Sequence, residues 1–405
     1  MKYFSKPWFV AICFIILMKP GCVSGMDVLA PLDALLNLLR ILLVLYALMV
    51  FGKSMLVLPI NQLLLAFLLV GASILWEPIA TILNGKSVAD IGSLVNNLGI
   101  ALVSYMALRV SYDAFIKALA KVSGTYVILN FLSVVLFPGG MYATEKYTQN
   151  YFLSYRTAWL TAYLLALTTV LLWNENAHTH ASKRFSAAVI IAAAVSMVMQ
   201  WTATGLFCFT LAGCVLAVYT YRKRRSIKIQ WLILIEAIVF WIVVIARLMD
   251  MFSFLLVNVL KKDLTLTFRT RIWDNALNSI QKNFLFGVGR LSTEQMRQYL
   301  GFGASHPHNN YLAVLMCFGI VGLTLLILTI YCSNKGFFIK GREQEGRIMM
   351  AAYIVMLTAA QVETFFATGG YLIPLYLISA ALHCKVGRRK EFDKNDWISN
   401  TVSYE

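Results

Sequence analysis

The chain has 405 residues, of which 60% are hydrophobic and only 13% are charged. A soluble globular protein needs far more charged surface to cover its core, so this composition excludes one. The 35 Lys and Arg against 19 Asp and Glu give a net charge of +16. Nucleic-acid binding is not required to explain this excess, because membrane proteins retain Lys and Arg in their cytoplasmic loops.

Uncharged stretches long enough to cross a bilayer recur along the chain, which predicts an all-α, polytopic membrane protein with about 12 transmembrane helices. The stretch 185–221 is too long for one crossing and has Gln200–Gly205 near its middle, so we predict a helical hairpin there. The predicted helices cover residues 5–20, 32–51, 55–76, 91–111, 122–137, 157–173, 185–200, 204–221, 229–250, 309–331, 348–365 and 370–385.

The distribution of Lys and Arg predicts how these helices are oriented. With the N-terminus inside, 22 of the 35 basic residues fall on the cytoplasmic side, whereas the short external loops hold only Lys86, Lys146 and Arg156. The chain then divides into helices one to nine (1–250), one large external loop (251–307), helices ten to twelve (308–385) and a cytoplasmic tail (386–405). Arg40 and Glu236 lie within predicted helices, and we expect them to form structural pairs inside the bundle.

The external loop contains one predicted amphipathic helix over residues 270–284. Its apolar residues recur at helical spacing, so we expect it to lie against the membrane surface or the bundle. Gly287–Gly289 and Gly301–Gly303 predict turns, and His306–Asn310 precedes the next membrane helix. The apolar residues of the amphipathic helix are Ile272, Trp273, Ala276, Leu277 and Ile280.

Three ordered sequence elements occur between residues 268 and 322. Arg269, Ile272 and Trp273 form an Arg-x-x-Ile-Trp sequence, and a Gly-x-Gly turn follows at 287–289. His308-Asn309 is then followed by nine residues and a Gly-x-x-Gly at 319–322. In these elements the chain resembles the O-antigen ligase and O-antigen polymerase superfamily. We expect the two glycines of the last element to allow close helix packing.

The resemblance implies a glycosyltransferase in the bacterial cytoplasmic (inner) membrane, with both termini cytoplasmic and the active site facing the periplasm. Such an enzyme takes a glycan from an undecaprenyl pyrophosphate carrier and joins it to a sugar hydroxyl. The implied partners are this donor, a lipid-linked glycan or lipid A core as acceptor, membrane lipids and a chain-length regulator, with no nucleic acid. No cofactor is expected because the pyrophosphate is already activated, and no metal because the external loops lack a paired-carboxylate motif.

The candidate site residues follow from the chemistry of this transfer. His308 is the candidate base, because a sugar hydroxyl must lose its proton to attack. Arg269 is the candidate cation that stabilises the leaving pyrophosphate. The further candidates for substrate binding are Arg271, Arg156, Asn309, Glu363 and Trp273, of which Glu363 is expected to orient His308 or bind an acceptor hydroxyl, and Trp273 to stack on a sugar.

The chain departs from the superfamily pattern in one external turn. Members often carry Ser-Arg-Thr-Gly there, but Thr202–Gly205 has Ala203 at the Arg position. Arg156 is the best substitute, and Arg247 and Arg290 are further candidates. The missing Arg favours a polymerase, with a ligase as the alternative. A polysaccharide flippase is the alternative from another class, but a transporter more often shows two related halves than one dominant loop.

Overall fold

The computed structural model describes residues 2–54, 61–88, 90–145, 147–221, 227–247, 265–365 and 370–384. This part of the chain is helical throughout, with one isolated bridge between Tyr142 and Asn150 and no strand. The prediction of an all-α fold is thereby confirmed for the described residues. The predicted tail 386–405 and the first part of the predicted external loop, 251–264, lie outside them.

Eight helical segments among the described residues are long and apolar enough to cross a membrane. They contain α1 (Pro7–Leu17) with α2 (Gly21–Gly25), α3 (Ala30–Ser54), α4 (Gln62–Leu83), α5 (Ile91–Val110), α6 (Tyr112–Leu136), α7 (Trp159–Ala177), α8 (His180–Met199) and α15 (Asn310–Ser333). The other bundle helices are α9 (Ala203–Tyr221), α10 (Ile229–Phe240), α16 (Glu343–Ala360) and α17 (Ile373–Leu382). Each predicted helix overlaps one of these, while the exact number of crossings stays a prediction.

Several predicted helix boundaries were wrong, and the shifts were largest for two helices. The predicted helix 55–76 is α4, which begins where the Asn61 side chain accepts a hydrogen bond from the Leu64 N–H and continues past Glu77 to Leu83. The helix tolerates Glu77 because this carboxylate pairs with Arg290. The predicted helix 122–137 is α6, which already begins at Tyr112 because Ser111 caps it. Counting only uncharged residues therefore misplaced both helices.

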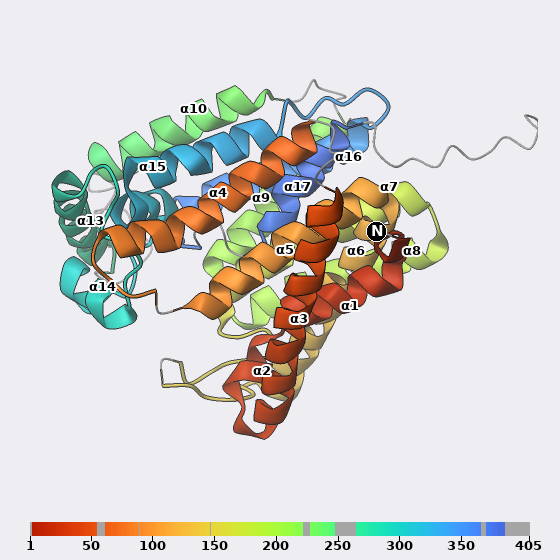
Figure 1. The fold of residues 1–405 in the computed structure, drawn as a ribbon, viewed down its shortest axis with the longest axis horizontal. Coiled ribbons are helices and arrows are strands. Elements are labelled where there is room, and N and C mark those ends of the chain that lie inside the picture. Colours follow the sequence, from red (N-terminus) through yellow and green to blue (C-terminus); the bar gives the residue numbers. More distant parts are fainter. Residues whose placement is uncertain are drawn as a thin grey trace, which may run out of the picture.

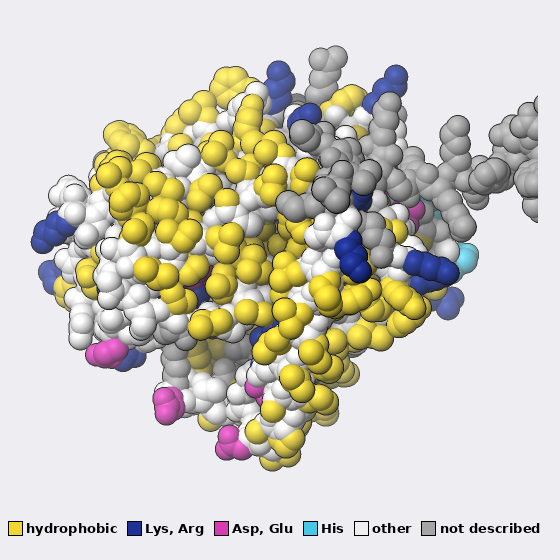
Figure 2. Space-filling model, viewed as in Figure 1, with side chains coloured by type: hydrophobic (Ala, Val, Ile, Leu, Met, Phe, Trp, Pro, Cys, Tyr) yellow, Lys and Arg dark blue, Asp and Glu magenta, His cyan; other side chains and the backbone are white. Residues whose placement is uncertain are grey.

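The predicted hairpin within 185–221 is confirmed, because α8 ends at Met199 and α9 begins at Ala203. In the bundle, α6 packs against α7 and α8, α15 against α4, and α16 against α9 (Figure 1). Many hydrophobic side chains are exposed on α3, α4 and α10, and Figure 2 shows them spread over most of the visible face. A surface of this kind fits a lipid environment.

The turns at residues 84–88, 200–202, 283–309 and 361–365 gather at one end of the bundle, which we call the site end. Hydrogen bonds join them: Asn84 Nδ2 donates to the Gly287 carbonyl over 3.0 Å, and the Phe365 N–H donates to Asn310 Oδ1 over 3.1 Å. At the opposite end, His383 Nε2 lies 3.4 Å from Asn334 Oδ1. Turns distant in sequence therefore meet at one end.

The predicted amphipathic helix is confirmed as α13 (Thr265–Lys282), which begins five residues earlier than expected. Its apolar face includes Ile272, Trp273, Ala276 and Ile280, all at most 6% exposed. This face packs against α15 and against α14 (Thr293–Leu300), so the helix lies on the bundle. Figure 1 shows α13 and α14 beside the ends of α4 and α15.

Candidate active site

Helix α15 is broken at Gly319, and a loop from the predicted external segment fills the break. Gly319 has φ +65° and ψ −166°, a conformation that side chains exclude. The Val288 and Gly289 N–H groups donate to the Met316 and Cys317 carbonyls over 2.9 and 2.8 Å. The Ile320 N–H donates to the Phe284 carbonyl over 2.9 Å. Every one of these bonds satisfies a backbone group that the break frees within an apolar helix.

The sequence elements Gly-x-Gly and Gly-x-x-Gly meet at this break. A Cβ at Gly287 would collide with the backbone of Cys317, and a Cβ at Gly319 would collide with the Leu285 carbonyl. The expected role of Gly319 in packing between helices was therefore wrong. Gly319 instead leaves room for the backbone of the loop that contains Leu285 and Gly287. At Gly322 the expectation stays a prediction, because a Cβ there would collide with Phe318 of the same helix and lie at an ordinary contact distance of 3.5 Å from Trp76 of α4. Trp76 Nε1 also donates to the Phe318 carbonyl over 2.9 Å, which fixes the break.

His308 lies in the short turn between α14 and α15, held from both sides. Its φ of +53° is uncommon for a residue other than glycine, and such conformations concentrate at functional sites. On one side, Trp273 Nε1 donates to the Pro307 carbonyl over 2.9 Å. On the other, Asn309 caps α15 by accepting from the Leu312 N–H over 3.0 Å. The ring of His306 lies 4.0 Å from that of His308, centroid to centroid.

Asn309 connects this turn to the end of α16. Its Nδ2 donates to the backbone carbonyl and to Oε1 of Gln361, over 3.1 and 3.3 Å. Gln361 Nε2 in turn donates to Glu236 Oε2 over 2.9 Å. Asn309 is fully buried and its side chain has protein partners, so the expected contact with substrate does not fit; Asn309 positions His308. Glu236, expected to pair with another charge, bonds to an amide.

Arg269 lies close enough to His308 to influence its charge, and Glu363 interacts with Arg269. Burial, with the nearby His306 and the positive charge of Arg269, lowers the pKa of His308 to about 3. Burial also lowers the pKa of Arg269, against the opposing effect of Glu363. Burial raises the pKa of Glu363, opposed by the Thr204 hydroxyl, which donates to Glu363 Oε1 over 3.2 Å, and by Arg269. In the free protein His308 is therefore a neutral imidazole.

Arg156 and Glu363 line one cavity of about 160 Å³ at the site end. Ala203 and Thr204, from the turn where superfamily members often carry Arg, line the same cavity. Arg156 Nη1 donates to the Gln200 carbonyl in that turn over 3.1 Å. The guanidinium of Arg156 thus lies beside the turn that holds Ala203, the position for which the sequence suggested it as a substitute.

The structure also places Trp273 and Arg271, two further predicted residues. Trp273 is 5% exposed and its N–H is bonded to Pro307, so its ring is not available to stack on a sugar. Arg271 points away from Arg269: it is exposed, and its guanidinium lies 5.8 Å from the centre of the Phe302 ring. This agrees with the helical geometry, in which residues two apart face different directions.

Residues 202–327 match the model of a protein family described as O-antigen ligase. In this part the chain is similar to the O-antigen ligase and polymerase superfamily. The match begins in the turn that holds Ala203 and ends in α15, so it includes α13, the Gly287–Gly289 loop, His308 and the break at Gly319. The resemblance inferred from the sequence elements is confirmed. The search of curated proteins found no match.

Three residues of this site were not among the predicted ones: Gln361, Thr204 and Trp76. None belongs to the ordered elements between 268 and 322. Thr204 could have been found from the sequence, because it follows Ala203 in the turn that departs from the superfamily pattern. No sequence pattern pointed to Gln361 and Trp76, because their partners Asn309 and Phe318 are distant in sequence.

Proposed function

We propose that the chain is a glycosyltransferase that polymerises lipid-linked oligosaccharide units of a surface polysaccharide, using an undecaprenyl pyrophosphate-linked glycan as donor. One observation carries this proposal: a neutral His308, held in a fixed turn, shares the site end with Arg269, Arg156 and Glu363. A neutral imidazole accepts a proton, and guanidinium groups bind a pyrophosphate. The superfamily match over residues 202–327 supports this chemistry.

In the proposed mechanism His308 removes the proton from an acceptor hydroxyl. The hydroxyl oxygen attacks the anomeric carbon of the donor sugar from the side opposite the pyrophosphate, so the configuration inverts. The bond between this carbon and the pyrophosphate oxygen breaks, and the pyrophosphate leaves with the electron pair. Arg269 and Arg156 neutralise its charge. Glu363 holds Arg269 in place and accepts a hydrogen bond from an acceptor hydroxyl.

The distribution of charge supports a site end that faces the periplasm of a bacterial inner membrane. Most basic residues at the described ends of the bundle helices lie at the opposite end, as expected for the cytoplasmic side. At the opposite end are Lys53, Arg109, Lys117, Lys183, Arg184, Lys228, Lys335, Lys340, Arg342 and Arg347.

The acceptor distinguishes a polymerase from a ligase. We expect purified protein in liposomes, supplied with undecaprenyl pyrophosphate-linked repeat units alone, to give a ladder of products that differ by one unit. Gel electrophoresis of the labelled glycans measures this. Transfer only when lipid A core is added would instead establish the ligase, and flux of intact lipid-linked units without bond formation would establish the flippase.

The pKa of His308 predicts an unusual pH dependence. Because the imidazole must be deprotonated to act and burial lowers its pKa to about 3, we expect kcat/KM to stay flat from about pH 8 down to about pH 5. The bound pyrophosphate is an anion that stabilises the imidazolium, so kcat is expected to fall at a higher pH than kcat/KM. The substrate is a diphosphate diester and does not titrate here. A kcat/KM that falls tenfold per pH unit below about 6.5 would indicate an ordinary histidine instead.

A further inference from the structure

Two further cavities lie at the site end, one on each side of Arg290. The larger, of about 660 Å³, is lined by residues of α4, the turn before α5 and the start of α14. The smaller, of about 340 Å³, is lined by residues of α3, α4, α5 and the segment after α16. Glu77, Asn97 and Arg290 line both, so we treat them together as the Arg290 cavities. Their sizes are typical of ligand sites.

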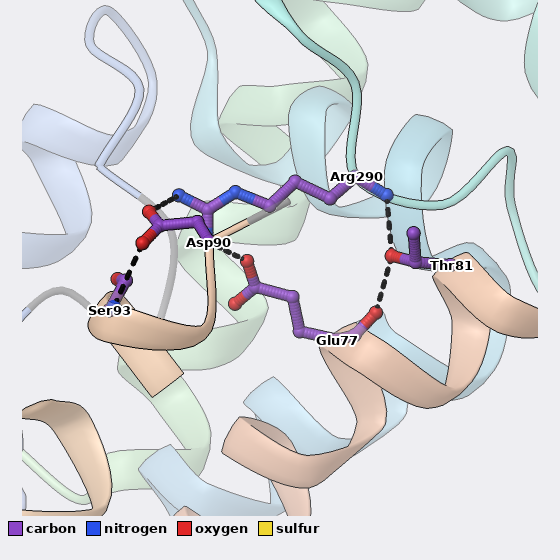
Figure 3. Close-up of polar contacts among 5 residues, drawn as sticks. All are labelled: Glu77, Thr81, Asp90, Ser93 and Arg290. Carbon is purple, nitrogen blue, oxygen red and sulfur yellow. Dashed lines mark hydrogen bonds and ion pairs between the residues drawn. The ribbon is translucent and has the colours of Figure 1, made fainter. Parts of the chain in front are cut away.

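Arg290 is fixed between the two cavities by paired charges. Its guanidinium forms ion pairs with Glu77 and, over 3.1 Å, with Asp90, as Figure 3 shows. Its backbone N–H donates to Thr81 Oγ1 over 2.9 Å, and Thr81 Oγ1 donates to the Glu77 carbonyl over 2.7 Å. The charge of Arg290 is therefore balanced, and the loop that carries it is fastened to α4.

The smaller cavity has an excess of positive charge. Lys19, Arg40 and Arg290 line it; Arg290 is paired with Glu77 and Asp90, so the excess is carried by Arg40. Lys19 is paired with Asp33, but Arg40 forms no ion pair within the described part of the chain, contrary to the structural pair expected for it; the carboxylates of Asp33 and Asp90 act on Arg40 from beyond ion-pair distance. Arg40 Nε and Asn96 Oδ1 are both buried without a hydrogen-bond partner among the described residues. A guanidinium in an apolar helix is costly unless an anion compensates it.

The larger cavity has the chemistry of a sugar site. Its carboxylates, amide and hydroxyl groups provide donors and acceptors for sugar hydroxyls, and Pro78 and Leu94 add apolar surface. The polar residues in it include Glu77, Ser87, Asp90, Asn97, Ser292, Thr293 and Gln295.

The Arg290 cavities lie next to the proposed catalytic residues. Phe365 lines the smaller cavity, and its N–H donates to Asn310 Oδ1, two residues after His308. Glu363 lines the cavity that holds Arg156. Residues 363 and 365 are at most about 7 Å apart along the chain, so this short segment separates the proposed pyrophosphate cations from the Arg290 cavities.

We propose that the Arg290 cavities bind the acceptor, a phosphate-bearing lipid-linked glycan. Its phosphate lies at Arg40 and Lys19 in the smaller cavity, and its sugars occupy the larger cavity, so that the terminal hydroxyl reaches His308. This inference rests on the proposed function, because only a transfer reaction requires two glycans to be bound together. It assigns donor and acceptor phosphates to different cations: Arg269 and Arg156 for the donor, and Arg40 for the acceptor.

Binding stoichiometry tests this assignment without requiring turnover. The probe is the repeat-unit oligosaccharide on a short isoprenyl diphosphate, titrated into His308→Ala protein in phosphatidylcholine nanodiscs. We expect two sites per chain. Adding Arg40→Gln should weaken one of them about tenfold or more, and adding Arg269→Gln should weaken the other. Lys53→Gln, on the same helix as Arg40 but at its opposite end, should change neither.

Two further variants and a competition measurement distinguish loss of the second site from misfolding and from phospholipid binding. Arg40→Lys retains the charge and should retain the second site. If Arg40→Gln does not fold, Asn96→Leu replaces it as the test. Asn96→Leu removes the other unpartnered group of the cavity and should also weaken the second site. Unchanged affinity of both sites in Arg40→Gln overturns the proposal, as does equal displacement of the probe by phosphatidylglycerol, which would mark a phospholipid site. A protein that binds two probes in this pattern but transfers no glycan contradicts the proposed function and leaves the second site in place.

Discussion

His308→Ala is expected to reduce glycan transfer by about 10²- to 10⁴-fold, the usual contribution of a general base. The lipid-linked donor should still bind, because Arg269, Arg156 and Glu363 remain. The loss should therefore appear in kcat, with little change in the KM of the donor. Steady-state initial rates of purified protein over a range of donor concentrations measure both quantities.

Two variants control for effects other than loss of the base. His180→Ala removes an exposed imidazole at the opposite end of the bundle and should leave activity unchanged. His306→Ala removes the ring packed against His308 and should cost less than His308→Ala, since it disturbs only the surroundings of the base. Transfer by His308→Ala at more than a tenth of the wild-type rate would mean that another group accepts the proton.

Gly319→Ala is expected to lower the stability of the protein by at least about 3 kcal/mol. The φ of +65° strains any residue with a Cβ, and this Cβ would also collide with the Leu285 carbonyl. Leu285 lies in the loop that satisfies the broken helix, so relief of the collision would leave backbone groups of α15 without partners. The melting temperature in detergent and the yield of monodisperse protein measure the loss.

Gly71→Ala is the matched control, because a Cβ at Gly71 in α4 meets nothing within 4 Å. That variant should be unchanged or stabilised by up to about 1 kcal/mol. Gly287→Ala should behave like Gly319→Ala, because Gly287 lies in the loop that fills the same break and its Cβ would collide with the backbone of Cys317. A stable Gly319→Ala protein would show that the break in α15 is not required for the fold.

The helical architecture could be predicted from the sequence because crossing a bilayer constrains the length and polarity of each segment independently of its neighbours. The amphipathic helix α13 was equally visible in its periodicity. Helix ends were less predictable where a distant residue neutralises a charge within the helix, as Arg290 neutralises Glu77 in α4. Such partnerships link residues more than two hundred positions apart and leave no local pattern.

The ordered elements pointed to the right part of the chain but not to the role of each residue. Both glycine elements were visible, whereas their meeting at the break in α15 depends on how the loop folds back. Asn309 and Trp273, predicted to contact substrate, are bonded to Gln361 and Pro307 and position His308. Arg40 was expected to have a charged partner, and the cavity that it lines with Arg290 became visible only in the structure.

The central claim is that the site end couples departure of a lipid pyrophosphate to formation of a glycosidic bond. Its most direct test is the amount of undecaprenyl pyrophosphate that purified protein releases per bond formed. We predict one molecule released per bond in the wild type, and almost no release together with almost no bond formation over the same time in His308→Ala or Arg269→Gln. Bond formation without this release, or equal release by the two variants, would contradict the account.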